Sequence, residues 1–122
     1  MAKILVIEDE MLIRLHVADS FRDSGFVVAE AADGASALLI LEQQPDIAAV
    51  FTDVTLPGEP DGFGIARWVR THRPGVPVFL TSGEVTAAHA GRIVGDEPFF
   101  AKPCDYADVA EAIRNRLAKR GA

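Results

Sequence analysis

The chain has 122 residues, of which 49% are hydrophobic and 25% are charged, a composition typical of one globular domain rather than a disordered segment. No apolar run approaches the roughly 20 residues of a membrane span, the N-terminus lacks the build of a signal peptide, and the single cysteine cannot form an internal disulfide. The 18 acidic side chains outnumber the 12 basic ones without a basic stripe, which disfavours nucleic-acid binding. We therefore expect one cytoplasmic domain over residues 1–122, without membrane contact, whose partners are proteins or small molecules.

The chain opens with a short run of branched apolar residues, followed by a stretch with the period of an amphipathic helix. In that stretch Ile13, Val17 and Phe21 recur at every fourth residue, which predicts an apolar stripe facing a sheet. Four further apolar runs follow, separated by helical stretches, the pattern typical of a parallel sheet covered on both faces. The predicted strands are residues 4–7, 27–30, 48–52, 76–81 and 98–101.

Capping residues and prolines bound the remaining predicted helices. Asp33 is a suitable N-cap for a helix that Pro45 ends, and a third helix is expected to begin near Asp61. Residues 86–93 predict only a short fourth helix, because this alanine-rich stretch is interrupted by glycine. The last helix is expected to begin after Asp105 and to end in basic residues, which suits the negative pole of the helix dipole.

Acidic residues follow two of the predicted strands, and a lysine follows a third. Glu8 and Asp9 close the first strand, Asp53 closes the third, and Lys102 follows the fifth. The carboxyl ends of strands in an open α/β sheet meet at one edge, where ligands bind. Three carboxylates there repel one another, and Lys102 compensates only one charge, so a hard divalent ion is expected as well. Alone, Glu8 and Asp9 would equally suit a helix cap, but the register with Asp53 and Lys102 favours a Mg²⁺ site.

Asp53 stands where an apolar strand enters a loop rich in proline and glycine. A carboxylate in that place can attack phosphorus to form an acyl phosphate, while a metal neutralises the oxygens of the transferring group. Ser82, which precedes a glycine, offers a hydroxyl that can donate to a phosphoryl oxygen. Lys102 follows an apolar strand, and we expect it to pair with the buried acids.

The chemical residues occur in a fixed order along the whole chain. They are Glu8-Asp9, Asp53, Pro57-Gly58, Asp61-Gly62, Ser82-Gly83 and Lys102-Pro103. Each dipeptide alone is common, but the ordered set closely resembles the receiver domain of bacterial two-component response regulators. The resemblance implies a flavodoxin-like (βα)5 fold, a doubly wound α/β sandwich around a five-stranded parallel sheet of order 2-1-3-4-5.

The resemblance also implies a role for each residue of the acidic cluster. Asp53 matches the phosphoacceptor of the family, and Lys102 matches the cation that contacts the phosphoryl group. Asp9 matches the carboxylate that ligates Mg²⁺ directly, and Glu8 matches its partner, which acts largely through water. The backbone carbonyl of Thr55 matches the third protein ligand, and Asp53 itself belongs to the metal site.

Further matched positions concern the response to phosphorylation. Ser82 matches a switch hydroxyl that turns toward the phosphoryl group, and Phe99 matches an aromatic switch three residues before the lysine. These residues are expected to move together with the surface of the fourth helix. Thr55 and Glu84 match positions that tune the lifetime of the acyl phosphate.

The resemblance implies a signalling switch that catalyses only its own phosphorylation and dephosphorylation, rather than a turnover enzyme. A histidine kinase or histidine phosphotransfer protein would supply the phosphoryl group. The surface of helix four, strand five and helix five would then change to control a downstream protein or pass the phosphoryl group on, as a monomer or a phosphorylation-dependent dimer. Because Met1 lies three residues before the first strand and Ala122 just beyond the last helix, we expect a stand-alone regulator without an output domain.

Three other interpretations are less favoured. A haloacid-dehalogenase-like phosphatase also forms an aspartyl phosphate, but it needs an acid where this chain has Thr55. A flavodoxin-like ligand binder would cradle phosphate at the first turn, which here is acidic. A receiver fragment of a hybrid kinase would carry the same residues, and the sequence pattern alone does not separate it from a stand-alone regulator.

Overall fold

The computed structural model describes residues 1–83 and 97–121 of the chain. Strands and helices alternate along most of this part, and the last strand precedes a C-terminal helix. The elements are β1 (Lys3–Ile7), α1 (Met11–Asp23), β2 (Val27–Ala31), α2 (Gly34–Gln43), β3 (Ile47–Asp53), α3 (Gly62–His72), β4 (Val78–Ser82), β5 (Phe99–Ala101) and α5 (Tyr106–Gly121). No helix of these described ranges is long and apolar enough to span a membrane.

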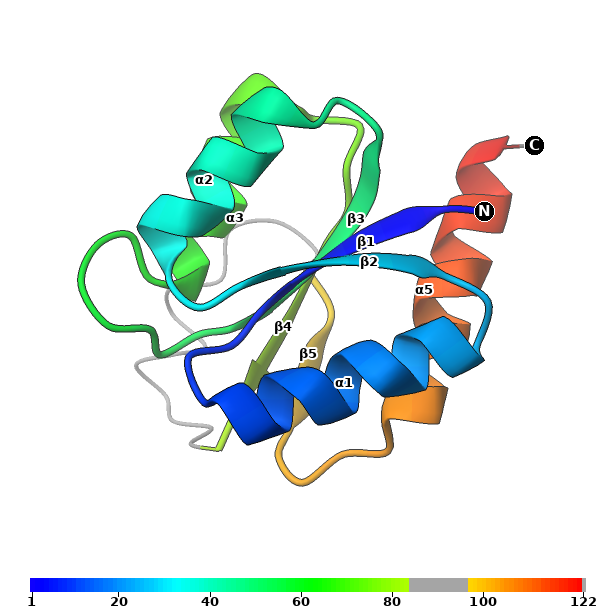
Figure 1. Ribbon diagram of the computed structural model, residues 1–122. Helices are drawn as coiled ribbons and strands as arrows, with labels where there is room; N and C mark the ends of the chain where they lie inside the picture. The colour runs from blue at the N-terminus through cyan, green and yellow to red at the C-terminus, as the bar shows by residue number, and fades with distance from the viewer. Residues whose placement is uncertain (84–96, 122) are drawn as a thin grey trace.

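The five strands form one parallel sheet in the order β2-β1-β3-β4-β5, which confirms the predicted doubly wound α/β fold. Helices α1 and α5 cover one face of the sheet, and α2 and α3 cover the other (Figure 1). The strand order reverses direction beside β1, between β1 and β3, where open sheets of this kind bind ligands beyond the carboxyl ends of the strands.

The core has two clusters, one on each face of the sheet, and successive residues of a strand enter different clusters because side chains alternate across a strand. In β1, Leu5 and Ile7 pack on the side of α2 and α3, whereas Ile4 and Val6 pack on the side of α1 and α5. Phe21, from the predicted apolar stripe of the first helix, is fully buried in the second cluster.

Aspartates cap three of the helices, as the sequence predicts. The Asp33 carboxylate accepts from the Ser36 amide at 2.8 Å, and the Asp61 carboxylate accepts from the Gly64 amide at 2.9 Å. Asp105 accepts from the amide two residues later at 2.9 Å, at the start of α5. Such caps satisfy amides that have no partner inside the helix.

The observed strands agree with the predicted ones to within two residues, and the largest difference is at β4. We expected this strand from residue 76, but it begins at Val78. The amide of Val76 instead donates to the carbonyl of Arg73 at 2.9 Å, which closes a turn, and Pro77 has no amide to donate. The predicted fourth helix, residues 86–93, lies outside the described residues.

Arg73, just after α3, holds the end of α2. Its guanidinium donates to the carbonyl oxygens of Leu41 (3.1 Å), Gln44 (3.1 Å), Pro45 (2.8 Å) and Ile47 (3.0 Å). Leu41 lies in the last turn of α2, where carbonyls have no amide partner within the helix, and the other three carbonyls belong to its C-cap and to the segment that leads into β3. The contact joins the two helices that cover the same face of the sheet.

Replacing Arg73 with methionine removes these hydrogen bonds while keeping most of the aliphatic stem. We expect Arg73→Met to lower the free energy of unfolding by about 2 kcal/mol, because bonds from a charged donor contribute roughly 1.5–3 kcal/mol. Urea unfolding followed by circular dichroism measures the change. Arg67→Met, on the exposed side of the same helix, is the matched control, and an equal loss in both variants would contradict the role of Arg73.

Candidate metal and phosphoryl site

The structure brings together the acidic residues that the sequence predicts at the carboxyl edge of the sheet. Glu8 follows β1 and Asp53 ends β3, and both are buried, whereas Asp9 is exposed at the rim. One carboxylate oxygen of each lies within 4.8 Å of the others. The three carboxylates therefore form one cluster, and Glu8 and Asp9 do not serve as the cap of α1, because Glu10 holds that position without a side-chain bond.

Lys102 connects the two buried carboxylates of the cluster. Its Nζ donates to Oδ2 of Asp53 at 2.7 Å and to Oε1 of Glu8 at 2.8 Å. The residue follows β5, and its own amide donates to the carbonyl of Ser82 at 2.9 Å, which continues the ladder between β4 and β5. The pairing predicted from the sequence is thus present, with the lysine side chain 21% exposed.

The remaining oxygens of the two buried carboxylates accept from the backbone. Oδ1 of Asp53 accepts from the Thr55 amide at 3.1 Å, and Oε2 of Glu8 accepts from the Glu10 amide at 3.2 Å. Every oxygen of Glu8 and Asp53 therefore has a donor, which makes the burial of two charged groups tolerable.

Burial and pairing act in opposite directions on the ionisation of the cluster. Burial raises the pKa of Glu8 above its usual value, against the lowering effect of the hydrogen bond from Lys102. Burial alone would lower the pKa of Lys102, but its hydrogen bonds and attraction to Asp53 and Glu8 outweigh this and raise it. Lys102 accordingly stays charged across the physiological range.

Two close backbone contacts support the loop that follows Asp53. The Gly62 amide at the start of α3 donates to the Val54 carbonyl at 2.9 Å, and a Cβ on Gly62 would collide with the Asp53 carbonyl oxygen. A Cβ on Gly34, at the start of α2, would likewise collide with the carbonyl of Pro60. Only glycine allows these helix ends to approach the loop so closely.

The predicted switch residues lie on the last two strands of the sheet, β4 and β5. Ser82 is buried at the end of β4. Phe99 is half-buried in β5, where it packs against the apolar core on the side of α2 and α3. Phe100 packs on the opposite side, as the alternation along the strand predicts. Glu84, predicted to tune the acyl phosphate, lies outside the described residues.

Two polar contacts near the site were not predicted from the sequence. The Thr81 hydroxyl donates to the carbonyl of Phe100 at 2.8 Å, adding a side-chain bond between β4 and β5 beside Ser82. The Arg14 guanidinium donates to the carbonyl of Glu8 at 2.9 Å. Both acceptors are backbone carbonyls, which a residue pattern does not reveal, and Arg14 reads simply as part of the polar face of its helix.

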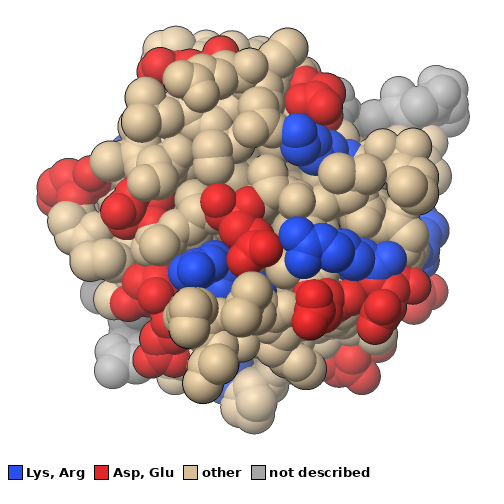
Figure 2. Space-filling view, in the orientation of Figure 1, with Lys and Arg blue, Asp and Glu red and all other residues tan. Residues whose placement is uncertain are grey.

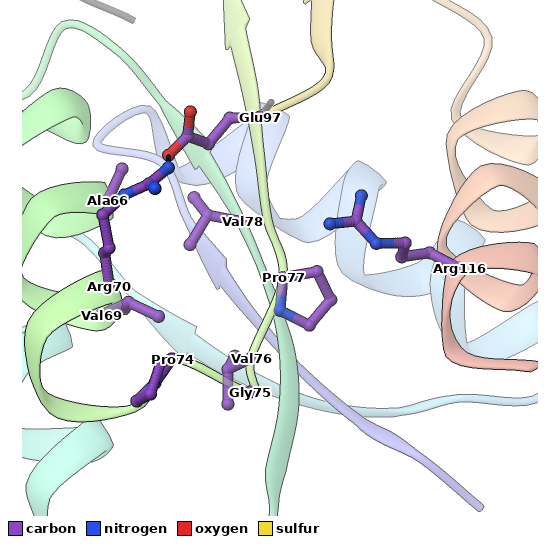
Figure 3. Close-up of a pocket in the computed structure, with 10 residues that line it drawn as sticks. All are labelled: Ala66, Val69, Arg70, Pro74, Gly75, Val76, Pro77, Val78, Glu97 and Arg116. Atoms are coloured by element: carbon purple, nitrogen blue, oxygen red, sulfur yellow. Dashed lines mark hydrogen bonds and ion pairs between the residues drawn. The ribbon is translucent and has the colours of Figure 1, made fainter. Parts of the chain in front are cut away.

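A separate hollow of about 350 Å³ opens at the other edge of the sheet (Figure 3). Residues of α3, the amino end of β4 and α5 line it, and an ion pair of 2.8 Å between Arg70 and Glu97 crosses one side. Arg116 reaches it from the opposite side. Because the hollow adjoins the amino end of β4, it is not part of the carboxylate cluster at the carboxyl ends.

The donor set fits a hard divalent cation. Three carboxylates and one ammonium leave an excess of two negative charges, and all the offered atoms are oxygens, as Mg²⁺ prefers. Asp9 is exposed and so can take a cation directly from water, and the carbonyl of Thr55 follows Asp53 in the same loop. The cluster can therefore hold Mg²⁺ through Asp9, Asp53 and Glu8.

Comparison with known proteins places these residues in a broader context. Residues 4–114 match the response regulator receiver domain family. The chain is 28% identical to sporulation initiation phosphotransferase F of Bacillus subtilis over 118 residues, covering 94% of the chain and 93% of that protein. It is 35% identical to a putative NtrX-like response regulator of Rickettsia felis over 103 residues, covering 82% of the chain but 22% of that longer protein.

Solved structures share the fold over almost the full length. The crystal structure of a response regulator receiver protein from Sinorhizobium medicae matches with a TM-score of 0.90 and 30% sequence identity. The match covers 98% of this chain and 96% of that one.

Removing the ammonium of Lys102 tests the electrostatics of the cluster. In metal-free buffer, Lys102→Met should raise the pKa of Glu8 further, because burial then acts without the lowering hydrogen bond. The folded chain would hold this proton to higher pH than the unfolded chain, so stability should fall as pH rises from the ordinary carboxyl range through the raised pKa. Carboxyl ¹³C NMR titration measures the midpoint of Glu8 ionisation. The same midpoint in wild type and Lys102→Met would contradict the lowering effect of Lys102 on the pKa of Glu8. Lys3→Met, at the other end of β1, is the control.

Proposed function

Because the chain belongs to the response regulator receiver domain family, we propose that it accepts a phosphoryl group on Asp53 in a Mg²⁺-dependent reaction and so acts as a phosphorelay switch. The observation that carries this proposal is the bridge from Lys102 to Asp53 and Glu8, with the exposed Asp9 at the same edge. The cluster combines a nucleophilic oxygen, a fixed cation and a place for a metal.

The transfer itself needs little from the protein beyond position and charge. A carboxylate oxygen of Asp53 attacks the phosphorus of a phosphohistidine; the P–N bond breaks, its electron pair stays on the imidazole nitrogen, and an acyl phosphate forms. When bound by Asp9, Asp53 and Glu8, Mg²⁺ supplies positive charge to the phosphoryl oxygens. The Thr55 amide holds Oδ1 of Asp53 while Oδ2 faces Lys102.

Lys102 connects this chemistry to a change of conformation. Phosphorylation through Oδ2 would displace Nζ from Asp53, and the ammonium would then contact the new phosphoryl oxygens. The Lys102 amide is bonded to the Ser82 carbonyl, and Phe99 lies in β5, the short strand that Lys102 follows, so a shift of the lysine would reach both proposed switch residues. Thr55 and Glu84 are proposed to tune the lifetime of the acyl phosphate.

The proposed output is a population shift rather than catalytic turnover. A ligand or modification shifts such an equilibrium only by its differential affinity for the two conformations, and here the phosphoryl group supplies it. The surface of β5, α5 and the fourth helix expected from the sequence at residues 86–93 would bind a downstream protein, pass the phosphoryl group on or pair with a second copy. The chain would catalyse only its own phosphorylation and dephosphorylation.

The proposed phosphodonor is a histidine kinase or phosphotransfer protein. On this chain, an apolar surface beside the carboxylate cluster could receive it. Met11 and Leu12 of α1 are 59% and 76% exposed. A hollow of about 470 Å³ between α1 and the segment after β5 is lined by Leu12, Lys102 and Tyr106 among others. Since Lys102 lines both this hollow and the carboxylate cluster, a donor seated there would bring its histidine to Asp53.

Replacing the acceptor carboxylate tests the chemistry. Asp53→Asn should abolish Mg²⁺-dependent labelling by a small acyl phosphate or phosphoramidate, because an amide lacks the nucleophilic oxygen charge. Phosphate-affinity electrophoresis and intact-protein mass spectrometry measure the label. Asp33→Asn, which changes an exposed helix cap after β2, should label like the wild type. Undiminished labelling of Asp53→Asn would sink the proposal.

A charge on the apolar surface tests the docking of the donor. Leu12→Asp should slow transfer from phosphorylated histidine kinases of the host by roughly tenfold or more, because central apolar contacts dominate binding. Labelling by the small donor should stay unchanged, since that donor needs no docking surface. Leu39→Asp is the matched control, because Leu39 is 56% exposed on α2, on the other face of the sheet. Equal slowing in both variants would argue against docking on α1.

A further inference from the structure

Arg14 of α1 contacts the backbone that joins the two acidic residues after β1. Its Nη1 donates to the carbonyl oxygen of Glu8 at 2.9 Å, and its Nε donates to Oε1 of Glu30 at 3.3 Å. The Arg14 side chain is only 17% exposed, so these bonds compete little with water. The carbonyl concerned belongs to the peptide unit between Glu8 and Asp9.

The backbone of Glu8 is held on both sides. Its amide donates to the carbonyl of Ala31 at 3.1 Å, and its carbonyl accepts from Arg14. Because each peptide unit is planar, holding both groups fixes the peptide planes before and after Glu8 and the direction in which the chain enters Asp9. Within residues 1–83 and 97–121, no hydrogen bond or ion pair holds the Asp9 side chain, so the main chain, which sets the direction of its Cα–Cβ bond, is what places its carboxylate within 4.8 Å of the other two.

Glu30, near the end of β2, keeps the Arg14 guanidinium in place. The same carboxylate also accepts from Arg22 at 3.3 Å, so two arginines of α1 share it. On the face that carries α1 and β2, basic and acidic groups stand side by side (Figure 2). The two arginines differ in one respect that matters here, because Arg14 reaches the Glu8 carbonyl whereas Arg22 pairs with Glu30 and Asp19.

We propose that Arg14 is a positioning residue for the divalent cation site. By holding the peptide unit between Glu8 and Asp9, it keeps the exposed Asp9 carboxylate directed at the same point as Asp53. This inference rests on the proposed function, since the cation site belongs to it. Outer partners that orient metal ligands typically change metal affinity by roughly 10–100-fold when they are removed.

The test compares Mg²⁺ binding by the full chain and two arginine variants, measured by isothermal titration calorimetry. Arg14→Met should weaken the Kd for Mg²⁺ by roughly tenfold. Arg22→Met removes a neighbouring arginine from the same Glu30 and should leave the Kd within about twofold of wild type. Thermal unfolding in EDTA, where no cation contributes, reports the purely structural loss in each variant.

The outcomes separate this inference from the proposed function. A wild-type Kd in Arg14→Met, or equal weakening in Arg22→Met, would overturn the role of Arg14 while leaving the cation site intact. A wild-type chain that binds no Mg²⁺ would instead overturn the proposed function. Arg14→Lys decides the matter should the methionine variant fail to fold: its single ammonium cannot reproduce the fork to Glu8 and Glu30, so a Kd weaker than that of wild type is expected. An unchanged Kd there would equally reject the inference.

Discussion

The bridge from Lys102 to Glu8 and Asp53 is the contact on which this edge of the molecule depends. It joins the carboxyl ends of β1, β3 and β5, and it places a cation between two carboxylates that would otherwise be buried against each other. Buried ion pairs add little stability over apolar residues of equal size, yet losing one partner leaves an uncompensated charge. The bridge therefore holds the acidic cluster together, and removing Lys102 would leave two buried carboxylates without a compensating charge.

The surrounding backbone completes what the lysine begins. Amides of Thr55 and Glu10 occupy the remaining oxygens of the two buried acids, and close packing at Gly62 keeps the strand end against α3. Asp9 differs, because it is exposed at the rim of the cluster and follows a backbone unit that Arg14 holds at the Glu8 carbonyl. The cluster thus has a rigid part, the two buried acids paired with the lysine, and an accessible part, the third acid at the rim.

Much of this arrangement could be predicted from the sequence, because it depends on features that a residue pattern records. Alternating apolar runs indicate the parallel sheet, and acids and a lysine after different strands meet at one edge whatever the details of packing. Hydrogen bonds to backbone carbonyls cannot be predicted in this way, because every residue has such a carbonyl. The bonds from Arg14 to the Glu8 carbonyl and from Thr81 to the Phe100 carbonyl are known only once the path of the chain is known. The start of β4 was also missed, because a turn at Val76 interrupts an apolar run that looks continuous.

The separation of the bridged residues along the chain bears on synthesis as well as on structure. Lys102 lies 94 residues after Glu8 and 49 after Asp53. Contacts this distant close only after most of the chain is ordered. A nascent chain whose last strand is still inside the ribosome has the two acids without their cation, so the complete electrostatic site exists only once the final strand has joined the sheet. The site can therefore take part in the proposed phosphoryl transfer only after the domain has folded completely.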